Sequence, residues 1–235
     1  MANKSLSARF ADWYERESKT TNYDVFMRLP ALFYFGFIIW LQARLITQLL
    51  STGLAFSDGL TFASLLARSA TMLVLLMFAG LTILRRKPVS RAKGVMPRLV
   101  AFLAVAILFG FPMLERSEPV MAIELASVVL SLISASLTGY VVLWLGRNFS
   151  TMPEARKLVT GGPYRLARHP LYLAEEIALL TLVLQYRTPV VVGLVILQFG
   201  LQIARTFYEE KVLSEAFPEY AGYQATTARI IPGVI

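Results

Sequence analysis

Two short segments near the end of this 235-residue chain combine residue types that could bind a small polar molecule. The first runs from Leu158 to Tyr172 and reads L-V-T-G-G-P-Y-R-L-A-R-H-P-L-Y. Its Gly-Gly-Pro turn lets the backbone approach a ligand closely, and Pro170 fits the first position of a helix, where free N–H groups can seat an anion or a carboxylate. Tyr164 and Tyr172 offer flat faces on which an adenine could stack. The alternative is a basic, aromatic loop that anchors the chain among lipid headgroups.

The second segment places charged residues near the end of a long apolar run. Arg205 and Glu209 are four residues apart and therefore share a helix face. The arginine precedes the glutamate, which is the weaker orientation for a helical ion pair, and ionisable groups at such a depth are candidates for function. An arginine can grip a carboxylate with two N–H groups, and a glutamate can hold an ammonium group. A plain intrahelical ion pair is the alternative.

Three further polar residues lie within the first segment or shortly after it. The single histidine, His169, precedes Pro170, where it either touches a ligand or orients the loop. Glu175 and Glu176 fall in the first helical turns after Pro170. Carboxylates there interact favourably with the helix dipole, but next to hydrocarbon they must face protein or water, which also permits a functional role.

The composition excludes several kinds of chemistry. The chain has no cysteine, so it has no disulfide, thiolate nucleophile, cysteine-bound zinc or iron–sulfur cluster. With one histidine, a histidine-based metal site is not expected, and we predict no metal. The net charge of +8 could indicate nucleic-acid binding. However, the basic residues cluster in loops between apolar runs, which is typical of membrane topology and of contact with anionic lipids.

Long apolar segments must position these residues. Of the residues, 56% are hydrophobic and 16% are charged, and the mean hydropathy is +0.59, so a soluble fold of this length would be nearly all core. We expect an all-α, polytopic transmembrane helical bundle. Its spans, about six in number, are predicted at 30–50, 62–84, 97–114, 119–146, 171–186 and 188–210.

The distribution of lysine and arginine predicts the orientation. Basic residues are frequent in the N-terminal segment, six lie in the loop 85–98, and five lie in the loop 147–170. The alternate loops offer only Arg116 and Arg187. Because cytoplasmic loops carry the excess of basic residues, both termini are expected in the cytoplasm. The polar N-terminal segment lacks a short apolar core with a cleavage site, and we expect no signal peptide.

At these residues the chain resembles the isoprenylcysteine carboxyl methyltransferase family and the related phospholipid methyltransferases. The resemblance covers roughly residues 145–232, whereas residues 1–118 carry no motif of the family. We therefore expect N-terminal membrane helices over 1–118 and a methyltransferase-like membrane domain with a C-terminal cytoplasmic segment over 119–235. The matching stretches are Leu158-Val159-Thr160, Gly162-Pro163-Tyr164-Arg165, Arg168-His169-Pro170-Leu171-Tyr172, Arg205 with Glu209-Glu210, and Phe217, Tyr220, Tyr223 and Pro232.

The resemblance implies a membrane-embedded enzyme that uses S-adenosylmethionine in a pocket closed by the last helices and the C-terminal segment. Arg205 would contact a lipophilic methyl acceptor, for which a prenylcysteine-type carboxylate is one candidate, and Arg205 and Glu209 would be the catalytic residues. The membrane would be a bacterial inner membrane or the endoplasmic reticulum, with the site facing the cytoplasm. The cofactor-binding residues would be Leu158, Val159, Tyr164, His169, Pro170, Leu171, Tyr172 and Glu209.

Four positions depart from the family pattern. Arg156 stands where the family commonly has histidine, Ala174 stands where it often has glycine, and Glu175-Glu176 is not its general pattern. These departures leave the acceptor open. Methyl transfer from a sulfonium needs placement of donor and acceptor more than an acid–base pair, and the cofactor supplies the electrophile.

Two alternatives remain. An NADPH-dependent sterol-type membrane reductase carries a related arginine-histidine-proline pattern, but it usually continues with asparagine and tyrosine on a longer chain, whereas Leu171 follows here. The second alternative is a non-enzymatic transporter or membrane scaffold of the same fold.

Overall fold

The computed structural model describes residues 21–53, 58–111 and 114–233, and this part of the chain is mostly helical. A two-stranded antiparallel ladder pairs β1 (Ser90–Arg91) with β2 (Glu154–Ala155). Short 3-10 turns follow α5 and α6 and form part of the loop before α7. The helices are α2 (Thr21–Phe26), α3 (Leu29–Ser51), α4 (Gly59–Leu84), α5 (Met96–Ala106), α6 (Met121–Leu145), α7 (Pro170–Tyr186), α8 (Pro189–Ala216) and α9 (Tyr220–Thr226).

Capping residues define where several of these helices begin. The Asp58 carboxylate accepts a hydrogen bond from the backbone N–H of Thr61 at 2.8 Å, which caps α4. Thr188 caps α8 in the same way, and a proline follows it at the first helical position. Since α7 ends at Tyr186 and α8 begins at Pro189, the two helices form a tight hairpin, which agrees with the expected segments 171–186 and 188–210.

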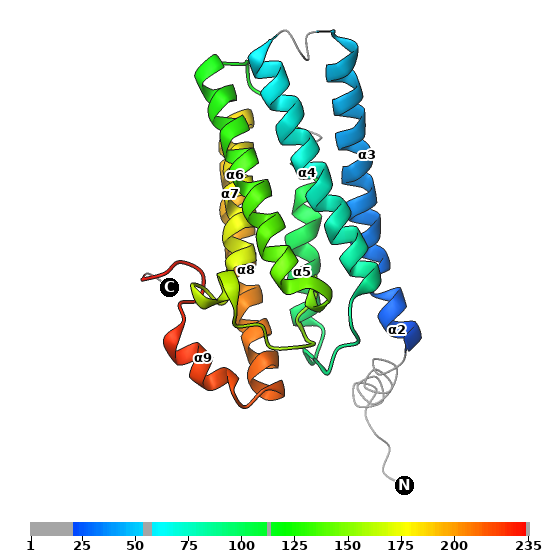
Figure 1. Cartoon of the computed structure of the whole chain (residues 1–235), viewed down its shortest axis with the longest axis vertical. Coiled ribbons are helices and arrows are strands. Elements are labelled where there is room, and N and C mark those ends of the chain that lie inside the picture. Colours follow the sequence, from blue (N-terminus) through cyan, green and yellow to red (C-terminus); the bar gives the residue numbers. More distant parts are fainter. Residues whose placement is uncertain (1–20, 54–57, 112–113, 234–235) are drawn as a thin grey trace.

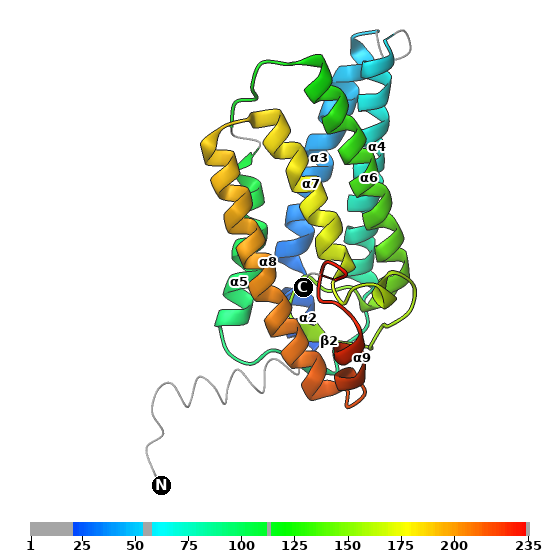
Figure 2. The same ribbon diagram turned by 90° about the vertical axis from the view of Figure 1, so that its left-hand side faces the viewer.

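The long helices stand side by side in an arc (Figure 1). α3 packs on α4, α4 on α6, α6 on α7 and α7 on α8, while α5 packs on the far side of α8. Figure 2 shows α5, α8 and α7 as neighbours. The largest apolar core lies between α3, α4 and α6, where Phe78 stacks on Phe35 and Phe149 with ring centroids 5.5 and 4.9 Å away.

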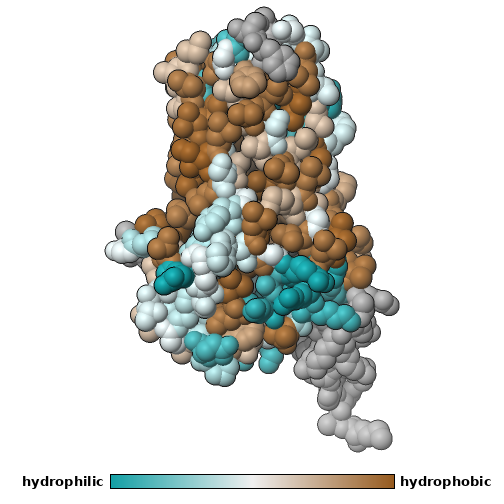
Figure 3. Space-filling model, in the orientation of Figure 1, coloured by the Kyte–Doolittle hydropathy of each residue, from teal (hydrophilic) through white to brown (hydrophobic). Residues whose placement is uncertain are grey.

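Four helices are long and apolar enough to cross a membrane: Tyr23–Ser51, Gly59–Leu84, Met121–Asn148 and Pro189–Ala216. Large apolar side chains such as Phe33 and Leu143 are exposed on their flanks, and Figure 3 shows hydrophobic surface over most of the bundle. A bilayer explains this exposure, because lipid solvates apolar side chains that water would not. The protein is an integral membrane protein.

The two remaining expected spans are shorter than a full crossing requires. The span expected at 97–114 is α-helical only over Met96–Ala106 and continues as a 3-10 turn to Phe109; residues 112 and 113 lie outside the described residues. α7 has 17 residues, which corresponds to about 25 Å of helix against a hydrocarbon core of about 30 Å. By length and composition, four helices of the described residues qualify as full spans, and the expected count of six stays a prediction.

The basic loops meet at one end of the bundle, together with α2 and α9 (Figure 1). There the backbone N–H of Arg86 donates to the carbonyl of Arg147 at 2.8 Å, and β1 pairs with β2. Asp24, which is 3% exposed, forms ion pairs with Arg28, four residues further on, and with Arg85 and Arg91 of the loop 85–98. These contacts tie the two basic loops together beneath the helices.

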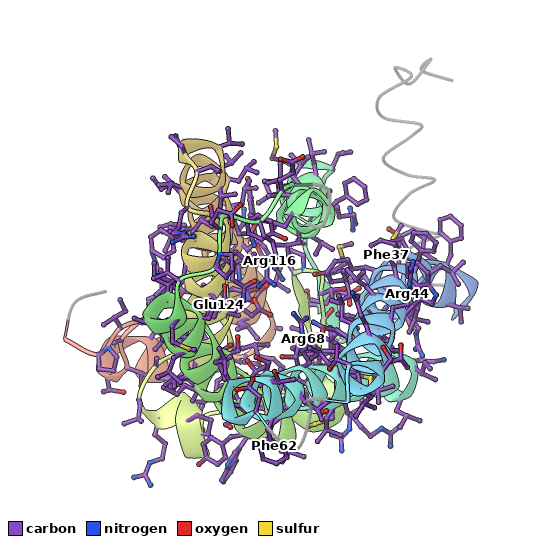
Figure 4. All side chains as sticks on the ribbon, turned by 90° about the horizontal axis from the view of Figure 1, so that it is seen from above. Phe37, Arg44, Phe62, Arg68, Arg116 and Glu124 are labelled. Carbon is purple, nitrogen blue, oxygen red and sulfur yellow. The ribbon has the colours of Figure 1, made fainter. Side chains whose placement is uncertain are left out.

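Figure 4 views the bundle from the opposite end, where α3 meets α4 and α6 begins. Arg68 reaches from α4 toward α3 and donates to Gln42 at 3.4 Å. Glu124 lies in the first turn of α6 at this end. Because this carboxylate is far along the bundle from the basic loops, it is a suitable control for substitutions made at their end.

Candidate functional site

The loop before α7 is held against the C-terminal segment by backbone hydrogen bonds. The N–H groups of Arg168 and His169 donate to the carbonyls of Ala228 and Arg229 at 2.8 and 2.9 Å. The Tyr223 hydroxyl, on α9, donates to the carbonyl of Tyr164 at 2.6 Å. The C-terminal segment thus folds back onto the loop, and this gives His169 a fixed position at the start of α7.

Gly162 lets this loop pass close to α6. Its φ is +58°, in the left-handed region that favours glycine. A Cβ at this position would lie 2.4 Å from two carbons of the Trp144 indole, far inside van der Waals contact. The Gly-Gly-Pro turn therefore needs its second glycine so that the loop can pack against Trp144.

His169, Tyr172, Arg205 and Glu209 meet where α7 and α8 face each other. The Tyr172 hydroxyl donates to Oε1 of Glu209, and the Tyr172 ring stacks on His169 with centroids 5.4 Å apart and an interplanar angle of 7°. Nδ1 of His169 lies 3.7 Å from Oε2 of Glu209, and Nη2 of Arg205 lies 3.7 Å from Oε1. The structure thus brings together the two segments that the sequence singled out.

Glu209 and Glu210 have different surroundings although they are adjacent. The Glu209 side chain is 21% exposed and faces the tyrosine and arginine just described. The Glu210 side chain is only 6% exposed and accepts hydrogen bonds from Arg168 at 2.9 Å and from two nitrogens of Arg229 at 3.1 and 3.0 Å. His169 and Gln224 also contact it, each at 3.3 Å. Glu210 therefore anchors the C-terminal segment, and Glu209 is the carboxylate left to a ligand.

Arg205 is buried, 6% exposed, and two of its three side-chain nitrogens have hydrogen-bond partners within the protein. Nη1 donates to Oε1 of Gln202 at 3.0 Å, Nη2 donates to the carbonyl of Thr151 at 3.3 Å, and the guanidinium lies 4.8 Å from the centre of the Tyr172 ring. Among the described residues, Nε of Arg205 and the hydroxyl of Thr151 are buried without a hydrogen-bond partner. Such orphaned groups inside a site indicate a missing ligand or water.

The rings of Tyr164 and Tyr172, on which an adenine was expected to stack, are covered by other parts of the protein. The Tyr164 side chain packs in the apolar core with Val159 and Leu171, and burial raises the pKa of its hydroxyl well above the ordinary value, so it stays neutral. The Tyr172 ring is covered by His169 and Arg205. Stacking of an adenine on either ring therefore has no open face in this structure.

An open depression of about 450 Å³ lies between the loop and α9. Its volume is within the usual range of small-molecule pockets, roughly 300–1,000 Å³. Tyr223 is an aromatic residue at its wall, and burial raises the pKa of that hydroxyl to about 12. Leu158, one of the expected cofactor residues, also lines it. The lining residues are Leu158, Thr160, Glu219, Gly222, Tyr223 and Thr226.

Sequence reasoning missed several residues that complete the site. Gln202 precedes Arg205 by three residues on α8, so helical spacing could have identified it. The contacts of Thr151 with Arg205 and of Trp144 with Gly162 depend on how the segments pack, and no spacing rule reveals them. The departure at Arg156 has a local explanation: this buried side chain pairs with Glu154 at 2.6 Å and donates to the carbonyl of Arg86 at 2.7 Å, both in the basic-loop network.

Comparisons with known proteins locate a family domain in the second half of the chain. Residues 119–220 match the phospholipid methyltransferase family model. The chain is 31% identical over 144 residues to the cobalt-zinc-cadmium resistance protein CzcN of Cupriavidus metallidurans, covering 59% of this chain and 62% of that protein. It is 26% identical over 107 residues to the nickel-cobalt-cadmium resistance protein NccN of Alcaligenes xylosoxydans xylosoxydans, covering 43% and 50%.

These relatives are matched over less than two thirds of their own length. Within residues 21–53, 58–111 and 114–233, no group of three or more histidine, aspartate or glutamate side chains could hold a metal ion. The family match includes α6, α7 and α8, and so it contains His169, Arg205 and Glu209. The match to the phospholipid methyltransferase family, which is related to the isoprenylcysteine carboxyl methyltransferases, thus covers the residues of the candidate site.

Proposed function

We propose that this protein is an integral membrane methyltransferase that uses S-adenosylmethionine to methylate a lipophilic acceptor. The observation that carries the proposal is the meeting of His169, Tyr172, Arg205 and Glu209 between α7 and α8, within the family domain. Intramembrane and interfacial charged groups are costly unless they serve a ligand or one another. Here the Glu210 carboxylate is fully paired within the protein, whereas the Glu209 carboxylate is not.

The residues at the site fit the groups of this cofactor. Glu209, one-fifth exposed, is suited to an ammonium group, and the positive end of the α7 dipole beside His169 is suited to a carboxylate. The depression beside Leu158 has an aromatic wall at Tyr223 and room for a nucleoside. When bound, S-adenosylmethionine supplies an electrophilic methyl group on a sulfonium. Four other expected cofactor residues would contribute through the shape of the loop, since their side chains pack inward: Val159, Tyr164, Pro170 and Leu171.

Arg205 is proposed to face the acceptor. Its position between Glu209 and Gln202 fixes the plane of the guanidinium, and the orphaned Nε is a donor available to a bound group. Holding the reacting groups in place is the main contribution that a protein makes to such a transfer. A lipophilic acceptor can reach the site along the apolar flanks of the helices.

The proposed orientation places both termini and the site in the cytoplasm, with about six membrane crossings that include the shorter α5 and α7. The supporting observation is that the basic loops, α2 and α9 share one end of the bundle. The membrane would be a bacterial inner membrane or the endoplasmic reticulum.

A membrane transporter is the second candidate, because the two relatives are named for resistance to metals. An NADPH-dependent reductase is the third, from the histidine-proline motif alone. A methyl-transfer assay distinguishes the methyltransferase from the transporter and the reductase. Membranes that contain the protein, incubated with S-adenosylmethionine labelled in its methyl group, should transfer label to extracted lipid, and membranes with Glu209→Ala should not. Equal labelling by both membranes would overturn the proposal.

A further inference from the structure

Within the described part of the chain, one hydrogen bond joins the Arg205 guanidinium to a segment outside α8. Nη1 donates to Gln202, and Nη2 lies 3.7 Å from Glu209, but both partners belong to α8 and move with it. Nη2 also donates to the backbone carbonyl of Thr151 at 3.3 Å, in the loop between α6 and α7. The Tyr172 ring on α7 lies 4.8 Å away, but a ring contact is less directional than a hydrogen bond. The Thr151 carbonyl therefore orients the guanidinium relative to the other helices.

Glu154, three residues after Thr151, holds this part of the loop in shape. Its side chain is 6% exposed, and Oε2 accepts hydrogen bonds from the Ser150 hydroxyl at 3.0 Å and from Nη2 of Arg156 at 2.6 Å. The Ser150 hydroxyl in turn accepts from the backbone N–H of Met152 at 3.2 Å. Through the serine, the carboxylate thus closes the turn that contains Thr151.

Further support for this turn comes from the part of the chain that precedes the family match. Nε of Arg91 lies 3.1 Å from Oε1 of Glu154, which is an ion pair across the β1–β2 ladder. The backbone N–H of Ala92 donates to the carbonyl of Pro153 at 3.0 Å. Ala92 also belongs to a buried apolar cluster with Val212 of α8. The N-terminal half of the protein thereby holds the turn against α8.

We infer that Glu154 is a positioning residue for the proposed methyl transfer, because it holds the Thr151 carbonyl where it orients Arg205. The inference rests on the proposed function. Glu154 acts through the turn and is not itself catalytic, since its oxygens are engaged by a serine and two arginines. A displacement of about 1 Å at a reacting group can cost roughly 100-fold in rate, so loss of this support should appear in the turnover. Through Arg91, the N-terminal half then takes part in the reaction although it carries no motif of the family.

Substitution of Glu154 in the full chain tests this role. Glu154→Gln should lower the turnover of labelled methyl transfer about tenfold or more, while the affinity for S-adenosylmethionine stays within about threefold. Ser150→Ala is a milder variant that leaves both ion pairs of Glu154 in place, and it should lower turnover about fivefold, the loss expected from one hydrogen bond. Asp24→Asn removes the other carboxylate that pairs with Arg91, and should lower the melting temperature but not the turnover of the folded protein. Glu124→Gln, at the opposite end of the bundle, should retain wild-type turnover.

A double-mutant cycle with Arg205→Lys separates positioning from a general loosening of the fold. Lysine has no planar fork for the Thr151 carbonyl to orient, so Glu154→Gln should change turnover by less than about twofold in that background. Additive losses in the double variant, or unchanged turnover in both Glu154→Gln and Ser150→Ala, would overturn the inference and leave the methyltransferase proposal standing. Absence of transfer by the wild-type protein would count against the proposed function and against this inference with it.

Discussion

The adjacent glutamates of α8 allow a test of the site in which one substitution is made at two neighbouring positions. Glu210 accepts hydrogen bonds from two arginines, a histidine and a glutamine, and its side chain is 6% exposed. Glu209 contacts a tyrosine hydroxyl and lies 3.7 Å from nitrogens of His169 and Arg205. We predict that Glu210→Gln reduces stability and that Glu209→Gln reduces cofactor binding.

The expected magnitudes follow from these contacts. Removing one charge of a buried pair typically costs about 3–5 kcal/mol, because the partner charges stay buried. For a chain of this size that loss lowers the melting temperature by about 6–20 °C. Glu209→Gln should lower it by less than about 4 °C, since its ion pairs are longer and partly exposed. Loss of one charge-assisted hydrogen bond, about 1.5–3 kcal/mol, should weaken S-adenosylmethionine binding roughly 10- to 150-fold.

Both quantities can be measured on the full chain purified in detergent. Thermal unfolding followed by tryptophan fluorescence reports stability, and calorimetric titration reports cofactor affinity. The two variants should show opposite patterns: a large melting shift for Glu210→Gln and a large affinity loss for Glu209→Gln. If both melt at the same temperature, or if Glu209→Gln keeps wild-type affinity, the division of roles argued from the contacts is wrong.

Three further substitutions test other parts of the structure. Gly162→Ala should destabilise the loop by about 1–2 kcal/mol, because alanine is strained in the left-handed region, and the contact with Trp144 should add to this cost. The expected result is a lower melting temperature together with weaker cofactor binding. Arg205→Lys keeps the charge but not the planar fork, so labelled methyl transfer should fall at least tenfold while cofactor affinity changes less than about threefold; the reverse pattern would assign Arg205 to the cofactor. Asp24→Asn removes a buried carboxylate shared by three arginines, of which Arg91 keeps Glu154, and should cost about 3–5 kcal/mol in thermal unfolding. Asp58→Asn, at an exposed helix cap, should change stability by less than about 0.5 kcal/mol.

Much of the helical architecture follows from the sequence, because long apolar runs leave the backbone no alternative in a bilayer. α3, α4, α6 and α8 lie close to the expected segments. α7 also begins within one residue of the expected 171–186, and the weaker prediction concerns α5. Hydropathy averages over a window and does not reveal that the α-helix stops at Ala106, where a 3-10 turn takes over.

The candidate site was predictable where spacing along a helix carries the information. The four-residue separation of Arg205 and Glu209 places them on one face of α8. The roles of Glu209 and Glu210 could not be separated in this way, because the difference comes from Arg229, which follows about twenty residues later and reaches back to α8. Glu175 was ambiguous for the same reason: its partner, Gln202, belongs to another helix.

The central claim is that the meeting of α7 and α8 forms a binding site for S-adenosylmethionine. Calorimetric titration of the wild-type chain in detergent tests it most directly, with NADPH as the comparison ligand and Glu209→Ala as the control variant. We predict saturable binding of S-adenosylmethionine at one site per chain, none of NADPH, and loss of the signal in Glu209→Ala. Tight binding of NADPH, or S-adenosylmethionine binding that Glu209→Ala leaves unchanged, would contradict this account.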